Sequence, residues 1–184
     1  MRIIAGALKG RRLEAPTWEG LRPTSDKLRE TLFNVLQDRT PGANVLDGFA
    51  GTGAVGIEAL SRGASEVTFV ESDPRAARLV ERNLGRCGVN DRYVIIRARL
   101  AEAVRRLPAG TFDLVLLDPP YGADSLHAAL QEGAGLVASD GLLVIEHARR
   151  DVAPATADAL TKIREIVSGD SALSIFRPHG ESAV

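Results

Sequence analysis

The chain has 184 residues, and 45% of them are hydrophobic. This length and composition suffice for one well-buried core, but the chain is too short for two domains that each have a core of their own. Its single cysteine, Cys87, excludes an internal disulfide, and no apolar run approaches the ~20 residues needed to span a bilayer. The net charge is only −1, so the molecule as a whole is not the strongly basic body that nucleic-acid binding often produces.

The N-terminal segment is the most basic part of the chain. Residues 1–30 hold seven basic residues against four acids, a net charge of +3, and the rest therefore carries −4. Short apolar stretches broken by glycines predict a small hairpin in the first 15 residues, appended to the main fold. The first 12 residues contain Arg2, Lys9, Arg11 and Arg12 and no acid. Such a hairpin would bind phosphates, and the alternative is a solvated terminal hairpin.

The remaining elements alternate along the chain. Thr24 or Ser25 would cap a first helix, which Pro41-Gly42 would end. Strands are predicted at 44–47, 66–71, 93–97, 112–117 and 142–146, and helices at 54–62, 74–87, 101–107 and 125–137. This alternation indicates a parallel sheet covered on both faces. Residues 148–160 read as a surface loop or irregular helix, and 163–167 with 172–176 as an antiparallel edge hairpin.

A glycine-rich loop joins the first of these strands to its helix. The sequence Asp47-Gly48-Phe49-Ala50-Gly51-Thr52-Gly53-Ala54-Val55-Gly56 contains a formal GxGxxG, the spacing of a dinucleotide site. Glu71 follows Gly51 by 20 residues, at the end of the second strand, where an acid would hold ribose hydroxyls. On spacing alone, an NAD-dependent enzyme is therefore one reading of this loop.

Two residues of the loop favour a different cofactor. Asp47 ends the strand, and its carboxylate would repel a pyrophosphate but suits the amino group of the methionine moiety in S-adenosylmethionine (SAM). Phe49 would add an apolar wall. Glu71 would serve the ribose of either cofactor, so it does not discriminate between them. The alternative for the glycines is a tight turn with close helix packing.

A second motif, Asp118-Pro119-Pro120-Tyr121, directly follows the strand predicted at 112–117. Hydrogen bonds to the Asp118 carboxylate and the Pro119 carbonyl would hold an exocyclic amine with its lone pair aimed at a methyl donor. Tyr121 would stack on the base. Alone, the motif is equally consistent with a strand-ending turn in which Tyr121 packs locally. Because it and Asp47 both follow parallel strands, we expect them at one edge of the sheet, where α/β sheets bind ligands.

Nearly the whole chain resembles the bacterial 16S ribosomal RNA guanine-N2 methyltransferase family, which modifies guanine 966 of the small subunit. The resemblance rests on the glycine loop, residues 118–121, Gly20-Leu21-Arg22-Pro23-Thr24 running into Arg29-Glu30-Thr31-Leu32-Phe33-Asn34, and the late Gly169-Asp170-Ser171-Ala172-Leu173-Ser174. It implies an α/β fold with a Rossmann-like seven-stranded SAM-dependent methyltransferase sheet in residues 21–184, and a basic β-hairpin extension in residues 1–20.

The same resemblance implies SAM as the donor and 16S rRNA on an assembling small subunit as the partner. Asp118, Pro119 and Tyr121 would be catalytic, and the hairpin together with Arg22 would bind RNA. Many relatives have an acid after the third strand that contacts the adenine amine, whereas this chain has Arg97-Ala98-Arg99-Leu100. The expected cofactor residues are Asp47, Phe49, Gly51, Thr52, Gly53, Glu71, Ser72, Arg99 and Leu100.

Three rival functions remain open at this point: adenine-N6 methylation of DNA, NAD-dependent oxidoreduction, and a non-catalytic RNA-binding or assembly factor. The small size disfavours the first, because no separate sequence-reading domain is present. The residues His127, His147 and His179 lack the mutual spacing of a metal site, so we expect no metal. The chain start lacks the features of a signal peptide, and we expect a cytoplasmic monomer that does not bind membranes.

Overall fold

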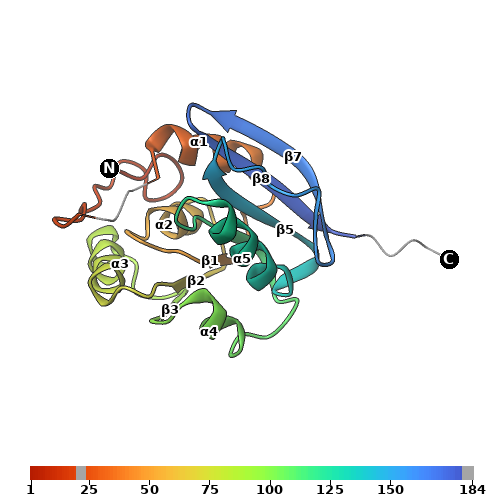
Figure 1. Ribbon diagram of the computed structural model, residues 1–184. Coiled ribbons are helices and arrows are strands. Elements are labelled where there is room, and N and C mark those ends of the chain that lie inside the picture. Colours follow the sequence, from red (N-terminus) through yellow and green to blue (C-terminus); the bar gives the residue numbers. More distant parts are fainter. Residues whose placement is uncertain (20–23, 180–184) are drawn as a thin grey trace.

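The strands of the chain form one mixed sheet in the computed structural model (Figure 1). The structure describes residues 1–19 and 24–179. The strand order is β3-β2-β1-β4-β5-β8-β7-β6. The first five strands are parallel, and β8, β7 and β6 are antiparallel to their neighbours. The strands are β1 (Asn44–Asp47), β2 (Glu66–Val70), β3 (Tyr93–Ile96), β4 (Phe112–Leu117), β5 (Val137–Ala148), β6 (Thr156–Ala157), β7 (Leu160–Ser168) and β8 (Ser171–Pro178).

The α/β fold and the C-terminal hairpin expected from the sequence are confirmed, with one strand more than the seven expected. Within the described residues the additional strand is β6, two residues long, which pairs with the start of β7. It lies in the segment 148–160 that the sequence assigns to a loop or irregular helix. Two residues carry no detectable periodicity, so sequence alone could not reveal this strand.

Local signals fix the helices α1 (Asp26–Val35), α2 (Ala54–Ser61), α3 (Pro74–Cys87), α4 (Leu100–Val104) and α5 (Ala123–Ala134). The Ser25 side chain caps α1 by accepting the Leu28 N–H at 3.2 Å. Asp73 caps α3, proline occupies its first turn, and Gly88 ends it in the left-handed conformation at φ 73°. The helix predicted to reach residue 137 ends at Ala134, because Val137 already belongs to β5.

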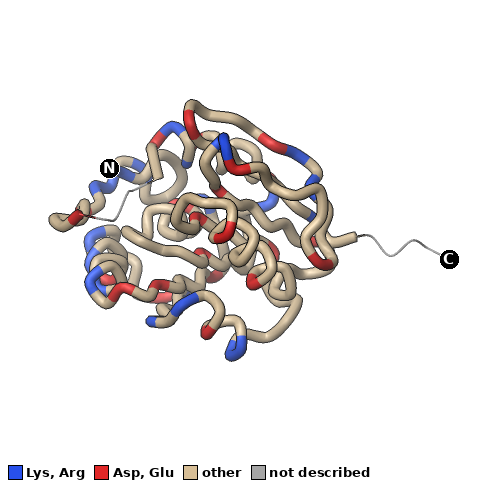
Figure 2. Tube along the Cα trace, in the orientation of Figure 1, with Lys and Arg blue, Asp and Glu red and all other residues tan. Residues whose placement is uncertain are grey.

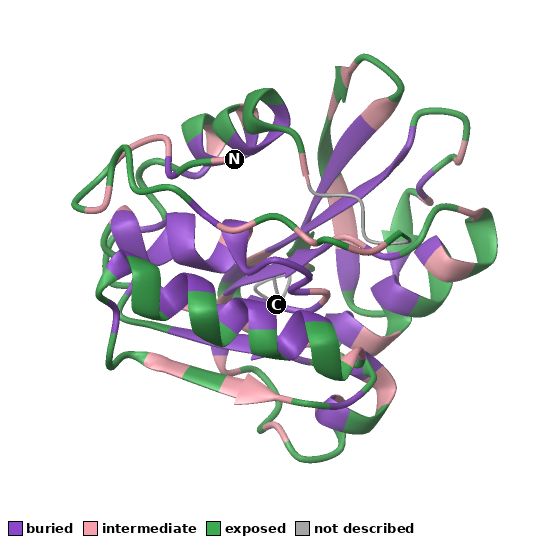
Figure 3. Ribbon diagram, turned by 90° about the vertical axis from the view of Figure 1, so that its left-hand side faces the viewer, coloured by how far each residue is buried: buried purple, intermediate pink, exposed green. Residues whose placement is uncertain are grey.

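The sheet separates two apolar cores, and alternate residues of each central strand point into different ones. Val45, Leu116 and Val144 pack with α1, α2 and α3 on one face. On the other face, strand residues such as Leu117 and Ile145 pack with α4 and α5. Figure 3 shows the resulting pattern, with buried residues on the inner sides of the helices and exposed residues outside. No helix among the described residues is long and apolar enough to cross a membrane.

The N-terminal segment pairs its two ends in antiparallel fashion and also packs closely against the main fold. Arg2 and Arg12 form an antiparallel bridge, the Ile3 N–H donates to the Arg11 carbonyl at 2.9 Å, and the Gly10 N–H donates to the Ile3 carbonyl at 2.9 Å. Ile3 and Leu13 are buried in the core that contains α1, α2 and α3. The Glu58 carboxylate on α2 accepts the backbone N–H groups of residues 4 and 5 at 2.8 and 3.0 Å. Apolar burial and these hydrogen bonds therefore place the segment on the helical layer.

Candidate active site

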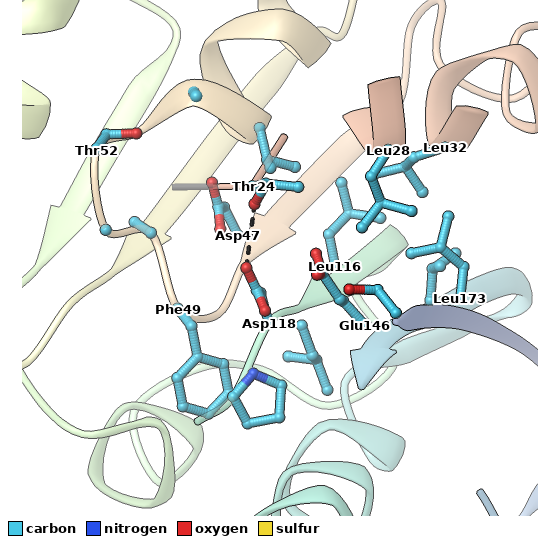
Figure 4. Close-up of a pocket in the computed structure, with 18 of the residues that line it drawn as sticks. Thr24, Leu28, Leu32, Asp47, Phe49, Thr52, Leu116, Asp118, Glu146 and Leu173 are labelled. Carbon is cyan, nitrogen blue, oxygen red and sulfur yellow. Dashed lines mark hydrogen bonds between the residues drawn. The ribbon is translucent and has the colours of Figure 1, made fainter. Parts of the chain in front are cut away.

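A cavity of about 490 Å³ lies at the carboxyl ends of the central strands, between the sheet and α1 (Figure 4). Leu28 and Leu32 of α1 form one wall. The glycine loop after β1 and the segment after β4 form the opposite rim. The volume falls within the range of about 300 to 1,000 Å³ that is typical of small-molecule sites.

Three carboxylates of the cavity lie on the same face of the sheet. Leu117 pairs with Ile145 in neighbouring parallel strands, so Asp118 and Glu146, the next residues, emerge side by side. Asp47 ends β1 on the other side of β4 and pairs with Leu116. Because strand residues alternate between faces, all three point to the face that α1 covers. The parallel register thus brings together acids that are up to 99 residues apart in the sequence.

Asp47 is a buried carboxylate whose pKa is strongly perturbed. Its side chain is only 4% exposed, and burial raises its pKa from 3.8 to about 7, although the Gly56 N–H donates to Oδ2 at 2.9 Å. The nearby charge of Glu71 raises it further. Removing a carboxylate from water disfavours its charged form, and a nearby cation would reverse that effect. The position therefore fits a ligand that carries a positive charge.

Glu71 follows β2 and fixes the glycine loop. Its Oε2 accepts the Gly51 N–H at 2.8 Å, and its Oε1 accepts the Asp73 N–H at 2.8 Å. Gly51 has φ 55°, in the region that favours glycine, so the loop can turn back toward β2. The carboxylate is thereby held at the cavity wall with a defined orientation, as an acceptor for ligand hydroxyls requires.

The segment after β4 forms the other half of the site. The Thr24 hydroxyl donates to Asp118 Oδ2 at 3.0 Å across the cavity (Figure 4). Tyr121 is 39% exposed, and its hydroxyl lies 2.8 Å from Ser171 Oγ and donates to Glu146 Oε1 at 3.4 Å. The Tyr121 ring therefore stands at the mouth, where it can cover a flat ligand that enters beside Asp118.

The structure brings most of the predicted site residues together. The cavity is lined by Asp47, Phe49, Gly51, Thr52, Glu71, Ser72, Asp118, Pro119 and Tyr121. Gly53 lies behind this lining with φ 78°, and a Cβ there would come within 3.1 Å of Val80. Two predicted cofactor residues are not part of the cavity lining: Arg99 is exposed before α4, and Leu100 is buried in the core beneath α4 and α5.

Most of the basic residues predicted to bind RNA lie on the surface of the N-terminal segment. Arg2, Lys9, Arg11 and Arg12 are exposed on the N-terminal segment, and Arg22 lies outside the described residues. Arg29, which belongs to the α1 motif that the family resemblance rests on, is fully buried. Its Nη2 donates to the Arg2 carbonyl at 2.6 Å and to Asp26 at 3.0 Å. Arg29 is therefore an internal anchor of the N-terminal segment.

Sequence reasoning did not include Glu146, Thr24 or Ser171 in the site. Glu146 could have been found, because it stands at the end of a predicted parallel strand, as Asp47, Glu71 and Asp118 do. The side chains of Thr24 and Ser171 reach the cavity only through the packing of α1 and of the β7–β8 turn region. No local pattern announces such contacts.

The sheet order, the acids at the carboxyl ends of its strands and the glycine loop together define a Rossmann-like SAM-dependent methyltransferase. The family model described as conserved hypothetical protein 95 matches residues 1–177. The chain belongs to this family.

Individual relatives match over almost the whole length. Ribosomal RNA small subunit methyltransferase D of Escherichia coli K12 is 35% identical over 187 residues, covering 99% of this chain and 93% of the relative. YlbH of Bacillus subtilis is 35% identical over 185 residues, with 98% and 100% covered. The solved structure of Escherichia coli yhhF has a TM-score of 0.85 at 31% identity, covering 98% and 99% of the two chains. A hypothetical protein of Thermus thermophilus has a TM-score of 0.79 at 32% identity, with 96% and 99% covered.

Proposed function

We propose that this protein methylates the exocyclic N2 amine of a guanine in small-subunit ribosomal RNA, with SAM as the methyl donor. The observation that carries the proposal is that Asp118, which opens the amine-binding motif, lines the same cavity as Asp47 and Glu71. The Escherichia coli relative named as a small-subunit rRNA methyltransferase supports this substrate class. The resemblance of residues 20–24 and 29–34 to the guanine-N2 methyltransferase family favours guanine 966 of 16S rRNA as the target.

The residues on the β1 and β2 side fit the cofactor. SAM, when bound, supplies a methyl group on a positively charged sulfur. Asp47 would balance the ammonium of its methionine moiety, and Glu71 would accept hydrogen bonds from its ribose hydroxyls. Phe49 and the backbone of Gly51, Thr52 and Gly53 would complete this half of the site. The raised pKa of Asp47 supports the assignment, because a bound cation would offset the cost of burying its charge.

The residues after β4 would orient the base. A guanine N2 amine is a weak nucleophile because its lone pair is delocalised into the ring. Acceptance of its N–H groups by Asp118 and the Pro119 carbonyl would fix the nitrogen and offset the positive charge that develops on it. The exposed ring of Tyr121 would stack on the base, which must be unpaired or swung out of its stack to enter.

The exposed basic residues of the N-terminal segment would hold the RNA beside the cavity (Figure 2). Contacts from Arg2, Lys9, Arg11 and Arg12 to phosphates would position the RNA without reading its sequence, as would Arg22. We propose further that the substrate is an assembling small subunit and that the protein acts as a cytoplasmic monomer.

The direct test is methylation of undermethylated small subunits with labelled SAM, followed by mapping of the modified nucleoside. We expect one N2-methylguanosine in the small-subunit rRNA. A matched titration with SAM and with NAD checks the cofactor independently. Binding of NAD without binding of SAM would contradict the proposal, and so would N6-methyladenosine as the only product.

A further inference from the structure

Glu146 is a nearly buried acid of the cavity to which the proposed reaction gives no role so far. Glu146 is 8% exposed, and it lies on the cavity face of β5 beside Asp118, which follows the neighbouring strand β4 (Figure 4). Its Oε1 accepts the Tyr121 hydroxyl at 3.4 Å, and that hydroxyl contacts Ser171 at 2.8 Å. Burying a carboxylate is costly, so its place next to the amine site calls for a chemical reason.

The hydrogen-bonding edges of the two purines supply that reason. Guanine presents its N2 amine next to a protonated N1, so two adjacent positions donate hydrogen bonds. Adenine presents its N6 amine next to an unprotonated N1, whose lone pair a carboxylate repels. Asp118 and Glu146 directly follow Leu117 and Ile145, which pair in neighbouring strands. Neighbouring strands lie about 4.8 Å apart, a spacing at which two carboxylates can accept from adjacent donors of one ring.

We propose that Glu146 accepts the N1–H of the target base and thereby selects guanine over bases with an unprotonated N1. This inference rests on the proposed guanine-N2 methylation and specifies how the same cavity chooses its base. Asp118 holds the amine, Glu146 reads the neighbouring ring nitrogen, and Tyr121 with Ser171 fixes the Glu146 carboxylate. Leaving a buried acceptor without a hydrogen-bond donor costs free energy. Such a contact therefore discriminates strongly between a protonated and an unprotonated N1.

The test uses small subunits reconstituted with either guanine or 2,6-diaminopurine at the methylated position. Diaminopurine keeps the N2 amine but has an unprotonated N1. We expect the wild type to methylate guanine about tenfold or more faster, as a contact worth at least 1.4 kcal/mol requires. Glu146→Gln can donate its amide N–H to an unprotonated N1, so the preference should shrink at least severalfold. Glu102→Gln, an exposed acid on α4, is the control and should keep the wild-type ratio.

Equal rates of the wild type on the two bases would overturn the inference, and so would an active Glu146→Gln enzyme with an unchanged ratio. If Glu146→Gln is inactive, the wild-type ratio alone decides. Methylation of neither base by the wild type would instead contradict the proposed function, so the two failures are distinguishable.

A different observation concerns the outer face of α3. Arg75, Arg78, Arg82 and Arg86 follow one another at spacings of three, four and four residues, so they lie along one side of the helix, and all are exposed. Among the described residues, Arg78 and Arg86 form no ion pair. The helix begins two residues after Ser72, which lines the cavity.

The N-terminal segment extends this row of arginines. The Glu14 N–H donates to Asn83 of α3 at 2.7 Å, and Arg82 pairs with Glu14 at 2.9 Å. The Arg75 guanidinium lies 5.2 Å from the centre of the Trp18 ring. Together, residues 1–19 and 73–88 carry eight basic residues and four acids, a net charge of +4 in a chain of net charge −1. Figure 2 shows their basic residues gathered on one side of the molecule.

We infer that α3 and the N-terminal segment form one phosphate-binding surface that guides an RNA strand to the cavity. This inference also rests on the proposed function, because the partner assigned to the surface is the RNA substrate. Arginine is suited to it, since the planar guanidinium can bind a phosphate through two hydrogen bonds. Contacts of this kind position the RNA and make its binding depend on salt.

The test compares two charge reversals that change net charge equally. Arg78→Glu/Arg86→Glu should weaken binding of a small-subunit rRNA fragment about tenfold or more at moderate salt. The slope of log affinity against log salt concentration should fall by the amount expected for the loss of about two phosphate contacts. Arg105→Glu/Arg106→Glu, after α4, should have a much smaller effect. SAM affinity should stay unchanged in both. Equal loss in both variants, or no loss in the first, would overturn the inference, whereas a wild type that methylates no rRNA would contradict the proposed function.

Discussion

At the scale of single residues, Asp47 combines a structural cost with a binding role. Its carboxylate is nearly buried, and its pKa is raised to about 7 by burial and by the charge of Glu71. In the folded protein without ligand, the neutral form is therefore favoured over a wider pH range than in the unfolded chain. A cationic ligand removes this cost, so affinity and stability are coupled at this residue.

The first prediction concerns the pH dependence of stability. Because the folded pKa lies above the unfolded value of 3.8, the wild type should lose unfolding free energy relative to Asp47→Asn as pH rises from about 4 to about 7. The loss should be as much as about 4 kcal/mol and should level off above pH 7. Denaturant titrations of both proteins at several pH values measure it. Parallel pH profiles would show that Asp47 is not perturbed.

The second prediction tests whether Asp118 orients the target base without contributing to cofactor binding. Asp118→Ala should lower the rate of methyl transfer about 100-fold or more, because the amine loses its oriented acceptor, and should leave SAM affinity unchanged. Thr24→Val removes the hydroxyl that donates to Asp118 and should change the rate only a few-fold. Single-turnover assays and calorimetric titration give the two quantities. Full activity of a folded Asp118→Ala protein would show that Asp118 does not hold the amine.

At the scale of elements, the close contact of α2 with β2 depends on a glycine. A Cβ on Gly56 would lie 2.2 Å from the Phe69 ring, whereas one on Gly85 of α3 would meet nothing within 4 Å. Gly56→Ala should therefore destabilise the protein by about 1 to 3 kcal/mol through overpacking. Gly85→Ala should stabilise it by up to about 1 kcal/mol, because alanine favours the helix. Thermal unfolding of the two variants tests the pair, and shifts of the same sign would contradict the packing described.

The sequence predicts these elements well where local chemistry decides them. β1, β4 and α3 have the predicted bounds because apolar runs end at acids, and because proline and glycine bracket the helix. The placement of Asp47 and Asp118 at one cavity followed from the rule for parallel strands. Contacts that depend on packing between distant segments were not predictable, such as Thr24 with Asp118. Leu100 does not line the cavity, because its side chain is buried in the core beneath α4 and α5.

At the scale of the whole molecule, Glu58 joins the N-terminal segment to the helical layer. Its fully buried carboxylate accepts two backbone N–H groups and the Arg62 guanidinium at 2.8 Å, and it lies 3.7 Å from Arg29. The segment is thus held by a charge that has several partners. Such an arrangement is strongly destabilised when one member is removed, because the remaining charge stays buried.

The last prediction follows from this anchor. Glu58→Gln should lower the unfolding free energy by about 3 kcal/mol or more and increase protease cleavage within residues 1–13. Glu66→Gln, an exposed acid at the start of β2, should leave both measurements near the wild-type values. Denaturant titration and limited proteolysis give the result. Unchanged cleavage in Glu58→Gln would show that other contacts hold the segment.

The same anchor has a consequence for the order in which the chain acquires its structure during synthesis. Residues 4, 5 and 14 leave the ribosome before their hydrogen-bond partners on α2 and α3, which follow 53 to 69 residues later. The basic N-terminal segment cannot dock until those helices have emerged and packed on the sheet. The N-terminal segment is therefore made before its partners yet reaches its place only after them, and until then its arginines remain available to any nearby polyanion.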